Sequence, residues 1–212
     1  MIIAIDGPAA AGKGTLARHL AEHLRFAHLD SGSLYRAVAL KLIISGDDQE
    51  NEACMIKSSQ NIEQKHLNDP RLRDEATGSL ASKVASVEKV RENLLNFQRS
   101  FANKPPNGKE GAVIDGRDIG TVVCPQADYK FFVTASAEQR AKRRALELEE
   151  KHITADYDKI LHDIEKRDRQ DIERATSPLV QAPDAILLDT TQMDAENAFK
   201  TALSLIKSTK LV

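Results

Sequence analysis

The chain has 212 residues, of which 41% are hydrophobic and only 4% aromatic, and its 30 Lys and Arg residues stand against 32 Asp and Glu residues. This length suits one α/β domain with an aliphatic core, and the net charge of -2 excludes a general electrostatic attraction to nucleic acid or to an anionic membrane. Any anion must therefore be bound by local clusters of cations.

The first fifteen residues, MIIAIDGPAAAGKGT, carry the strongest functional signal of the chain. The apolar, β-branched run 2–5 predicts a strand buried on both faces of a parallel sheet, and apolar residues at helical spacing predict a helix over 13–24. The glycine-bracketed turn between them can point backbone amides and a helix N-terminus at a polyphosphate, to which a lysine adds a mobile charge. We predict a phosphate-binding loop that consists of Gly7, Pro8, Ala9, Ala10, Ala11, Gly12, Lys13, Gly14 and Thr15.

This loop departs from the strict pattern GxxxxGK[ST] at the residue after the lysine. Gly14 stands there, and the hydroxyl comes one position later, at Thr15. A side chain at position 14 therefore cannot coordinate Mg²⁺, which must be held by phosphates, waters and another residue. Asp115 follows the apolar run 112–114, where P-loop proteins carry a carboxylate that holds Mg²⁺ through water. An ordinary Asp-Gly turn is the alternative interpretation of this position.

The remaining chain alternates strand patterns with helix patterns. Further strands are expected at 27–30, 112–114, 129–134 and 185–188, and helices at 31–46, 74–86, 87–102, 136–150, 154–175 (one helix or a pair) and the C-terminus. This alternation predicts a three-layer α/β/α fold with a central parallel sheet. Asp6, Asp30 and Asp115 each end a predicted strand, so they are expected to line one rim of the sheet.

We expect one domain over 1–212, with a core of 1–35 and 110–212, a mobile helical insert of about 36–105 and a short lid of about 150–175. Two basic clusters lie on the charged helices near the lid. Charge runs usually mark a solvated face, but phosphoryl transfer needs several guanidinium groups over the phosphates. The clusters contain Arg140, Lys142, Arg143 and Arg144, and then Arg167, Arg169, Asp171 and Arg174.

Arg36 is a further candidate anion ligand, because it begins a helix directly after a predicted strand. The alternative is that Ser31 or Ser33 caps this helix and that the arginine is only solvated.

Five segments resemble, in the same order, the motifs of the bacterial cytidylate kinase family, which belongs to the nucleoside monophosphate kinases. They are GPAAAGKGT at 7–15, DSGSLYR at 30–36, SKVASVEKVR at 82–91, DGRDIGTVV at 115–123 and RDRQDIER at 167–174. The resemblance spans nearly the whole chain. It implies a P-loop core in which Mg²⁺ assists transfer of the γ-phosphoryl group from ATP to CMP or dCMP, in pyrimidine nucleotide metabolism.

The resemblance also implies roles for individual residues. The acceptor nucleotide would be held through its base by Ser82, Arg91 and Asp118, through its phosphate by Arg36, Arg117 and Arg174, and through its pentose by Arg167 and Asp171, with Ser31 beside them. We place Arg140 and Arg144 with the phosphate loop as ATP ligands. The residues expected to act in catalysis are Lys13, Arg117, Arg167 and Arg174.

One stretch departs from the family pattern. Many members carry a small antiparallel sheet in the insert, and the run from Gln49 to Ser79 is too short and too polar for one. Two alternatives to the function remain open, namely another small-molecule P-loop kinase of thymidylate or shikimate type, and a nucleotide-dependent switch or nucleic-acid motor. The first would share the phosphate loop but not the DGRD and RxxxDxxR sets.

The two cysteines, Cys54 and Cys124, are far apart and in no metal-binding spacing, which is typical of free thiols in a reducing compartment. No basic leader precedes the first strand, and no apolar run approaches the length of about 18 residues needed for a membrane span. We therefore expect a cytoplasmic monomer that binds its small-molecule substrates and neither nucleic acid nor a membrane.

Overall fold

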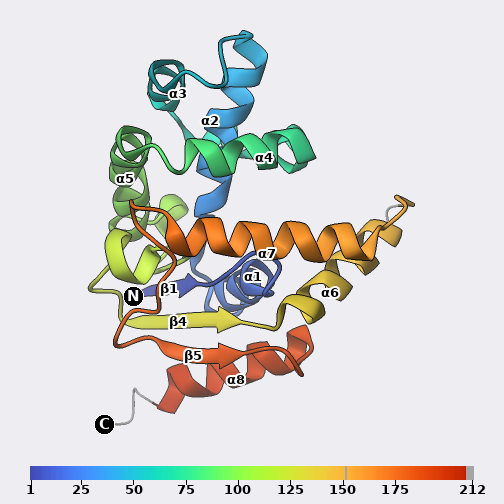
Figure 1. Ribbon diagram of the computed structural model, residues 1–212. Helices are drawn as coiled ribbons and strands as arrows, with labels where there is room; N and C mark the ends of the chain where they lie inside the picture. The colour runs from blue at the N-terminus through green and yellow to red at the C-terminus, as the bar shows by residue number, and fades with distance from the viewer. Residues whose placement is uncertain (151, 209–212) are drawn as a thin grey trace.

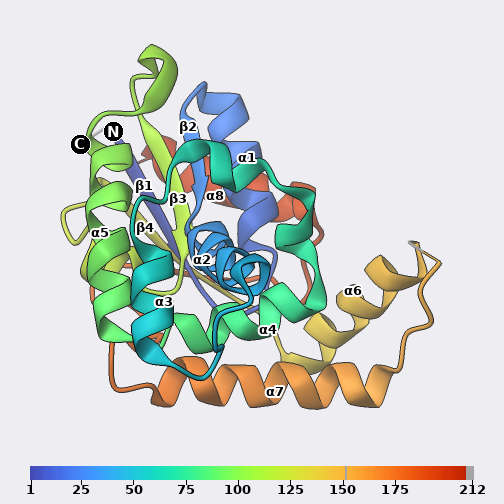
Figure 2. The ribbon, with the colours of Figure 1, turned by 90° about the horizontal axis from the view of Figure 1, so that it is seen from above.

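The computed structural model describes residues 1–150 and 152–208. Within them, five parallel strands form the centre of the molecule, in the order β2-β3-β1-β4-β5 (Figures 1 and 2). The strands are β1 (Ile2–Asp6), β2 (Ala27–Asp30), β3 (Ala112–Gly116), β4 (Tyr129–Thr134) and β5 (Ile186–Asp189). The register places Asp30 beside Asp115, and Asp6 beside Gly116. The predicted parallel sheet and its acidic rim are confirmed.

Helices cover both faces of this sheet because strand side chains alternate between two cores. Ile3 and Ile5 pack with α1 (Lys13–Leu24) and α8 (Ala195–Ser208), whereas Ala4 and Ile114 pack with α2 (Ser31–Ser45) and α5 (Glu88–Asn103). Gly46 ends α2 with a left-handed φ of 71°, as expected of a glycine C-cap. The three-layer α/β/α architecture is confirmed.

The insert between β2 and β3 is helical. It contains α3 (Glu52–Ser59), two short 3₁₀ turns (Gln64–Asn68 and Pro70–Arg73) and α4 (Glu75–Val84). Every strand in the described part of the chain belongs to the central sheet, so the insert has no small antiparallel sheet there. Seen from above, α3 and α4 lie around α2, and α3 lies beside α5 (Figure 2).

Residues 157–173 of the lid segment form one continuous helix, α7 (Tyr157–Glu173), which follows α6 (Ala137–Glu149). Both views show α7 running past α4 of the insert (Figures 1 and 2). A short π-helical turn, Ile119–Val123, follows β3 and was not expected from the sequence. No helix in residues 1–150 and 152–208 is long and apolar enough to cross a membrane.

Candidate functional site

The phosphate loop lies between β1 and α1, and two glycines determine its path. Gly7 has φ 152°, and a Cβ there would overlap the carbonyl oxygen of Val133 in the neighbouring strand. Gly12 has φ 88°, a left-handed conformation that turns the chain into the first turn of α1. The amides at the start of α1 therefore face the mouth of the loop, which is the geometry that binds anions at helix N-termini.

Lys13 lies in this mouth, half-buried, with Nζ donating to the carbonyl oxygen of Pro8 at 3.4 Å. The pKa of Lys13 is lowered to about 8, chiefly by burial and then by the positive charge of Arg117, while Asp115 and Asp30 oppose the shift. An ammonium group held in this way gains from an added anion. The position and electrostatics of Lys13 fit a phosphate ligand.

Asp115 ends β3 next to the loop and is 3% exposed. Its Oδ1 atom lies 2.8 Å from Nε2 of His28, and its Oδ2 atom lies 3.7 Å from where a Cβ on Gly14 would stand. Asp30 pairs with Asp115 in the register between β2 and β3, so the two carboxylates lie close together, although solvent reaches Asp30. Burial and then the charge of Asp115 raise the pKa of Asp30. Two carboxylates beside a loop position without a side chain fit a hydrated Mg²⁺ ion.

His28 was not expected to take part in the site. It stands in β2 two residues before Asp30, which pairs in register with Asp115, so its side chain is on the face that reaches this carboxylate. The contact between His28 and Asp115 could be predicted only from the pairing register of β2 and β3, and the sequence alone does not give that register.

The lid brings several arginines over the loop. Arg117 donates from Nε to Asp171 of α7 at 2.7 Å, and Nη1 of Arg174 lies 3.9 Å from the same carboxylate. Nε of Arg167 and Nη2 of Arg174 are buried and have no hydrogen-bond partner among the described residues. The pKa of Arg167 is lowered to about 10, chiefly by burial and then by the charge of Arg117. These donors form a cationic cluster with unmatched charge.

Arg36 lies near the same cluster, on the first turns of α2. Its Nη1 donates to the carbonyl oxygen of Leu72 at 2.8 Å, and its guanidinium group packs directly over Gly78 of α4. Burial lowers its pKa, and the charge of Arg117 acts in the same direction. The cap of α2 differs from the alternative interpretation, because Asp30 rather than a serine accepts the N–H of Gly32, at 2.9 Å.

The residues expected around the base are partly brought together. Arg91 and Asp118 form a buried ion pair, and the guanidinium carbon of Arg91 lies 5.3 Å from the centre of the Tyr35 ring. Ser82 is half-buried on α4 and makes no side-chain hydrogen bond in residues 1–150 and 152–208. Ser31 is 3% exposed and lies against Gly116, where a Cβ would overlap its hydroxyl group.

The two arginines expected to bind ATP differ from each other. Arg140 is 4% exposed and donates to Asp168 at 3.0 and 2.6 Å, to the carbonyl oxygen of Ala135 at 2.8 Å and to that of Ala9 at 3.3 Å. Arg140 therefore links the phosphate loop to α7, and its donors are already bonded to acceptors of the protein. Arg144 is exposed and pairs with Glu147 at 3.1 Å.

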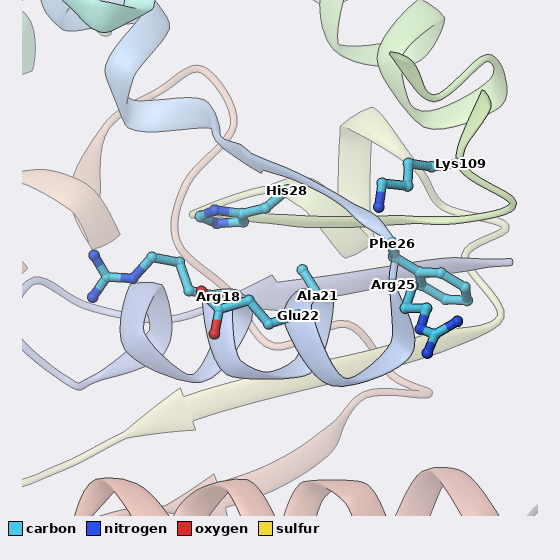
Figure 3. Close-up of a pocket in the computed structure, with 7 residues that line it drawn as sticks. All are labelled: Arg18, Ala21, Glu22, Arg25, Phe26, His28 and Lys109. Carbon is cyan, nitrogen blue, oxygen red and sulfur yellow. The ribbon is translucent and has the colours of Figure 1, made fainter. Parts of the chain in front are cut away.

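A separate pocket of about 380 Å³ lies between α1 and β2. It is lined by Arg18, Ala21, Glu22, Arg25, Phe26, His28 and Lys109 (Figure 3). The guanidinium groups of Arg18 and Arg25 point in opposite directions, so its cations do not converge on one point (Figure 3). This pocket touches the site described above through His28 and through Arg18, whose Nη2 donates to Oγ1 of Thr15 in the phosphate loop at 3.4 Å.

Residues 3–208 match the family model described as Cytidylate kinase. Curated relatives named "Cytidylate kinase" include one from Paramagnetospirillum magneticum, 54% identical over 98% of both chains, and one from Rhodospirillum rubrum, 49% identical over 97% of both. A solved structure, an uncharacterized protein from Eubacterium ventriosum, superposes with a TM-score of 0.58 at 17% identity, over 98% of this chain and 99% of that one. This last similarity concerns the fold alone.

Proposed function

The chain belongs to the cytidylate kinase family, and we propose that the residues of the site just described carry out its reaction. The protein is a phosphotransferase that moves the γ-phosphoryl group of ATP to CMP or dCMP, with CDP or dCDP and ADP as products. The observation that supports the residue assignment best is the pair of buried, unpartnered nitrogens, Arg167 Nε and Arg174 Nη2. A buried donor without an acceptor is costly, and phosphate oxygens would supply the missing acceptors.

Catalysis depends on positioning and charge neutralisation. The amides of the phosphate loop and Lys13 hold the donor phosphates, while Arg36, Arg117 and Arg174 hold the acceptor phosphate in line with them. No general base is needed, because the attacking phosphate oxygen is already ionised. Arg167, whose pKa is lowered by burial and by the nearby charge of Arg117, would act with Arg117 on the negative charge that spreads between donor and acceptor in the transition state.

The family's ATP-dependent transfer uses a divalent metal ion, and we propose Mg²⁺ held by Asp115 through water. His28 orients one oxygen of this carboxylate and leaves the other facing the phosphate loop. When bound, the ion would neutralise charge on the donor phosphates. Gly14 provides the space for its water shell.

The insert (36–105) and the lid (150–175) are proposed as the closing parts of a single kinase domain over 1–212. Support comes from the ion pairs that join α7 to the core, between Asp171 and Arg117 and between Asp168 and Arg140. Closure would exclude water and so suppress ATP hydrolysis. The protein would act as a cytoplasmic monomer on small molecules, which remains a prediction from its sequence.

The test is a panel of acceptors supplied with ATP, comprising CMP, dCMP, UMP, AMP, thymidylate, shikimate and a reaction without acceptor. CMP or dCMP should give the highest kcat/KM, and ADP should hardly form without an acceptor. A preference for thymidylate or shikimate would favour the other small-molecule kinases, and slow hydrolysis that ignores all acceptors would favour a switch.

A further inference from the structure

Asp6, the last residue of β1, connects two segments that the proposed function uses. It is 4% exposed, and its two carboxylate oxygens accept the backbone N–H groups of Ile119 and Gly120, each at 2.7 Å. These N–H groups begin the π-helical turn 119–123, and Gly7 of the phosphate loop follows Asp6 directly. One rigid carboxylate therefore ties the phosphate loop to the segment that contains Asp118.

The orientation of Asp118 depends on the two hydrogen bonds that Asp6 accepts from the turn. Its backbone has φ -142° and ψ 25°, outside the regular helix and strand regions, so its geometry is imposed by its neighbours. On one side Arg117 is held by Asp171, and on the other side Ile119 is held by Asp6. Loss of the second anchor would let the segment shift relative to the phosphate loop.

Gly120 permits the close approach of Asp6. A Cβ at position 120 would lie 3.3 Å from Oδ2 of Asp6 and 3.1 Å from Cδ of Lys130, and both separations are tighter than ordinary van der Waals contact. The Lys130 ammonium group does not neutralise Asp6, since it is engaged by Asp184 and by the carbonyl oxygen of Pro125. The carboxylate thus depends on the two backbone donors.

Burial of this carboxylate costs free energy, which is unfavourable for a residue that only caps the turn. Burial raises the pKa of Asp6 to about 6, although the two N–H groups oppose the shift. The charges of Asp118 and Arg117 also reach Asp6, and they act in opposite directions. A neutral Asn has one oxygen, so it could accept one N–H and would set its own NH₂ group against the other.

We propose that Asp6 is a positioning residue for base selection, which holds Asp118 in register with the phosphate loop without touching the substrate. The inference rests on the proposed role of Asp118 in reading the acceptor base. It predicts that damage at Asp6 affects recognition of CMP more than recognition of ATP. A residue that only stabilised the fold would not separate the two substrates.

The experiment compares Asp6→Asn with the wild type in kcat and KM for CMP, UMP and ATP. We expect the KM for CMP to rise about 10-fold or more and the preference for CMP over UMP to fall by a similar factor, because one anchoring hydrogen bond is lost. The KM for ATP should change less than about twofold, because the two glycines and α1 still shape the phosphate loop.

Asp128→Asn is the matched control. Asp128 Oδ2 accepts the N–H of Ile2 at 2.6 Å, which is the same kind of bond at the opposite end of β1. This variant should keep the CMP preference and all three KM values while its melting temperature falls. If Asp6→Asn lost only thermal stability, as Asp128→Asn is expected to do, the positioning role would be overturned.

Gly120→Ala gives a second measurement in case Asp6→Asn does not fold. It keeps the carboxylate but displaces it from the turn, so it should also raise the KM for CMP and reduce the preference for CMP. A folded Gly120→Ala variant with wild-type values would contradict the inference. Equal use of CMP and UMP by the wild type would instead refute the base-reading role of Asp118 and this inference with it, whereas a wild-type preference retained in Asp6→Asn would overturn only the role of Asp6.

Discussion

Helices α6 and α7 carry similar arginine clusters, yet the arginines of the two helices are bonded in different ways. On α6, Arg140 bonds Asp168 and two backbone carbonyls, and Arg143 bonds Thr190 and the carbonyl of Met193. At the end of α7, Arg167 and Arg174 each bury a nitrogen that no described residue accepts. A cluster of cations becomes a candidate ligand site where the protein leaves donors unpaired, because those donors gain most from an added anion.

The electrostatics around Arg117 support the same interpretation of the α7 cluster and the phosphate loop. The pKa of Arg167 is lowered to about 10 and that of Lys13 to about 8, in both cases chiefly by burial and then by the charge of Arg117. The protein therefore holds positive charges close together at a cost in stability. Polyphosphate binding would relieve this cost, so ATP should raise the melting temperature.

The largest effect is expected for Lys13→Met, which removes the positive charge of the side chain proposed to hold the donor phosphates. The value of kcat should fall by about 10² to 10³, because one contact to the developing charge of the transition state is lost. Steady-state kinetics with CMP and ATP measure this change. Lys142→Met, on the exposed side of α6, is the control and should keep its rate. A Lys13→Met enzyme with near-normal turnover would contradict the phosphate-loop assignment.

Arg174→Ala tests the cluster at the end of α7. We expect kcat to fall by about 10² or more, roughly 3 kcal/mol, with a smaller change in the KM for ATP, because the unpartnered nitrogen would bind the transferring or accepting phosphate. The control is Arg169→Ala, an exposed arginine of the same helix. If Arg174→Ala lowered only the melting temperature, Arg174 would be a structural partner of Asp171 and Ser177.

Arg140→Met tests the other side of the comparison. It should lower the free energy of unfolding by about 2–3 kcal/mol, because Asp168 would lose its ion-pair partner in a mostly buried position. Urea unfolding measures the loss, and kcat at a temperature where the variant is folded should change only a few-fold. A stable variant with a strongly raised KM for ATP would show instead that Arg140 binds ATP directly, as the sequence suggested.

Most of the fold was predictable because its signals are local. The bounds of β4 match the predicted strand, and the apolar spacing of α1 was sufficient to predict that helix. The elements that were missed include the two 3₁₀ turns of the insert, α3 and the π-helical turn. The polar composition of α3 hides a helix that fully buries few side chains, such as Met55, and the π-helical turn depends on Asp6, which is 113 residues away in the sequence.

The candidate site was predictable by residue type but not by partner. The sequence placed Arg140 and Arg174 in basic clusters of equal standing, and only the structure shows that Asp168 engages the first while the second keeps a buried nitrogen unpaired. His28 was missed for the same reason, since its contact with Asp115 depends on the register between β2 and β3. The hydrogen-bond partner of a side chain depends on residues far away in the sequence, so the type of the residue alone does not predict it.

The lowered pKa of Lys13 predicts a pH dependence of stability in the ligand-free protein. The folded-state pKa is about 8 and the ordinary value is 10.5, so between them the unfolded chain binds more protons than the folded one. The free energy of unfolding should therefore rise with pH through this window, by about 2–3 kcal/mol from this group. Urea unfolding at both ends of the window measures the rise. Lys13→Met should lack it, and an identical rise in that variant would assign it to other groups.

The smallest effect concerns Asp118, which forms an ion pair with Arg91 and is also proposed to recognise the base of the acceptor. Arg91 bonds Oδ2 of its carboxylate, and no donor in residues 1–150 and 152–208 bonds Oδ1, so one oxygen remains for the amino group of cytosine. Uracil has a carbonyl oxygen at that place, and two acceptors would face each other at a cost of about 1–3 kcal/mol. UMP should therefore be a poor substrate, and AMP a worse one.

Asp118→Asn sharpens this test because Arg91 can still donate to the amide oxygen, which turns the NH₂ group toward the base. That group can donate to the oxygen of uracil, so the ratio of kcat/KM for CMP to that for UMP should fall about 10-fold. Asp128 contacts the start of β1, far from the Arg91–Asp118 ion pair, so Asp128→Asn should leave the ratio unchanged. An unchanged ratio in Asp118→Asn would assign base recognition to residues of the insert instead, and then the Arg91–Asp118 pair would be a structural pair, like the protein-bonded arginines of α6.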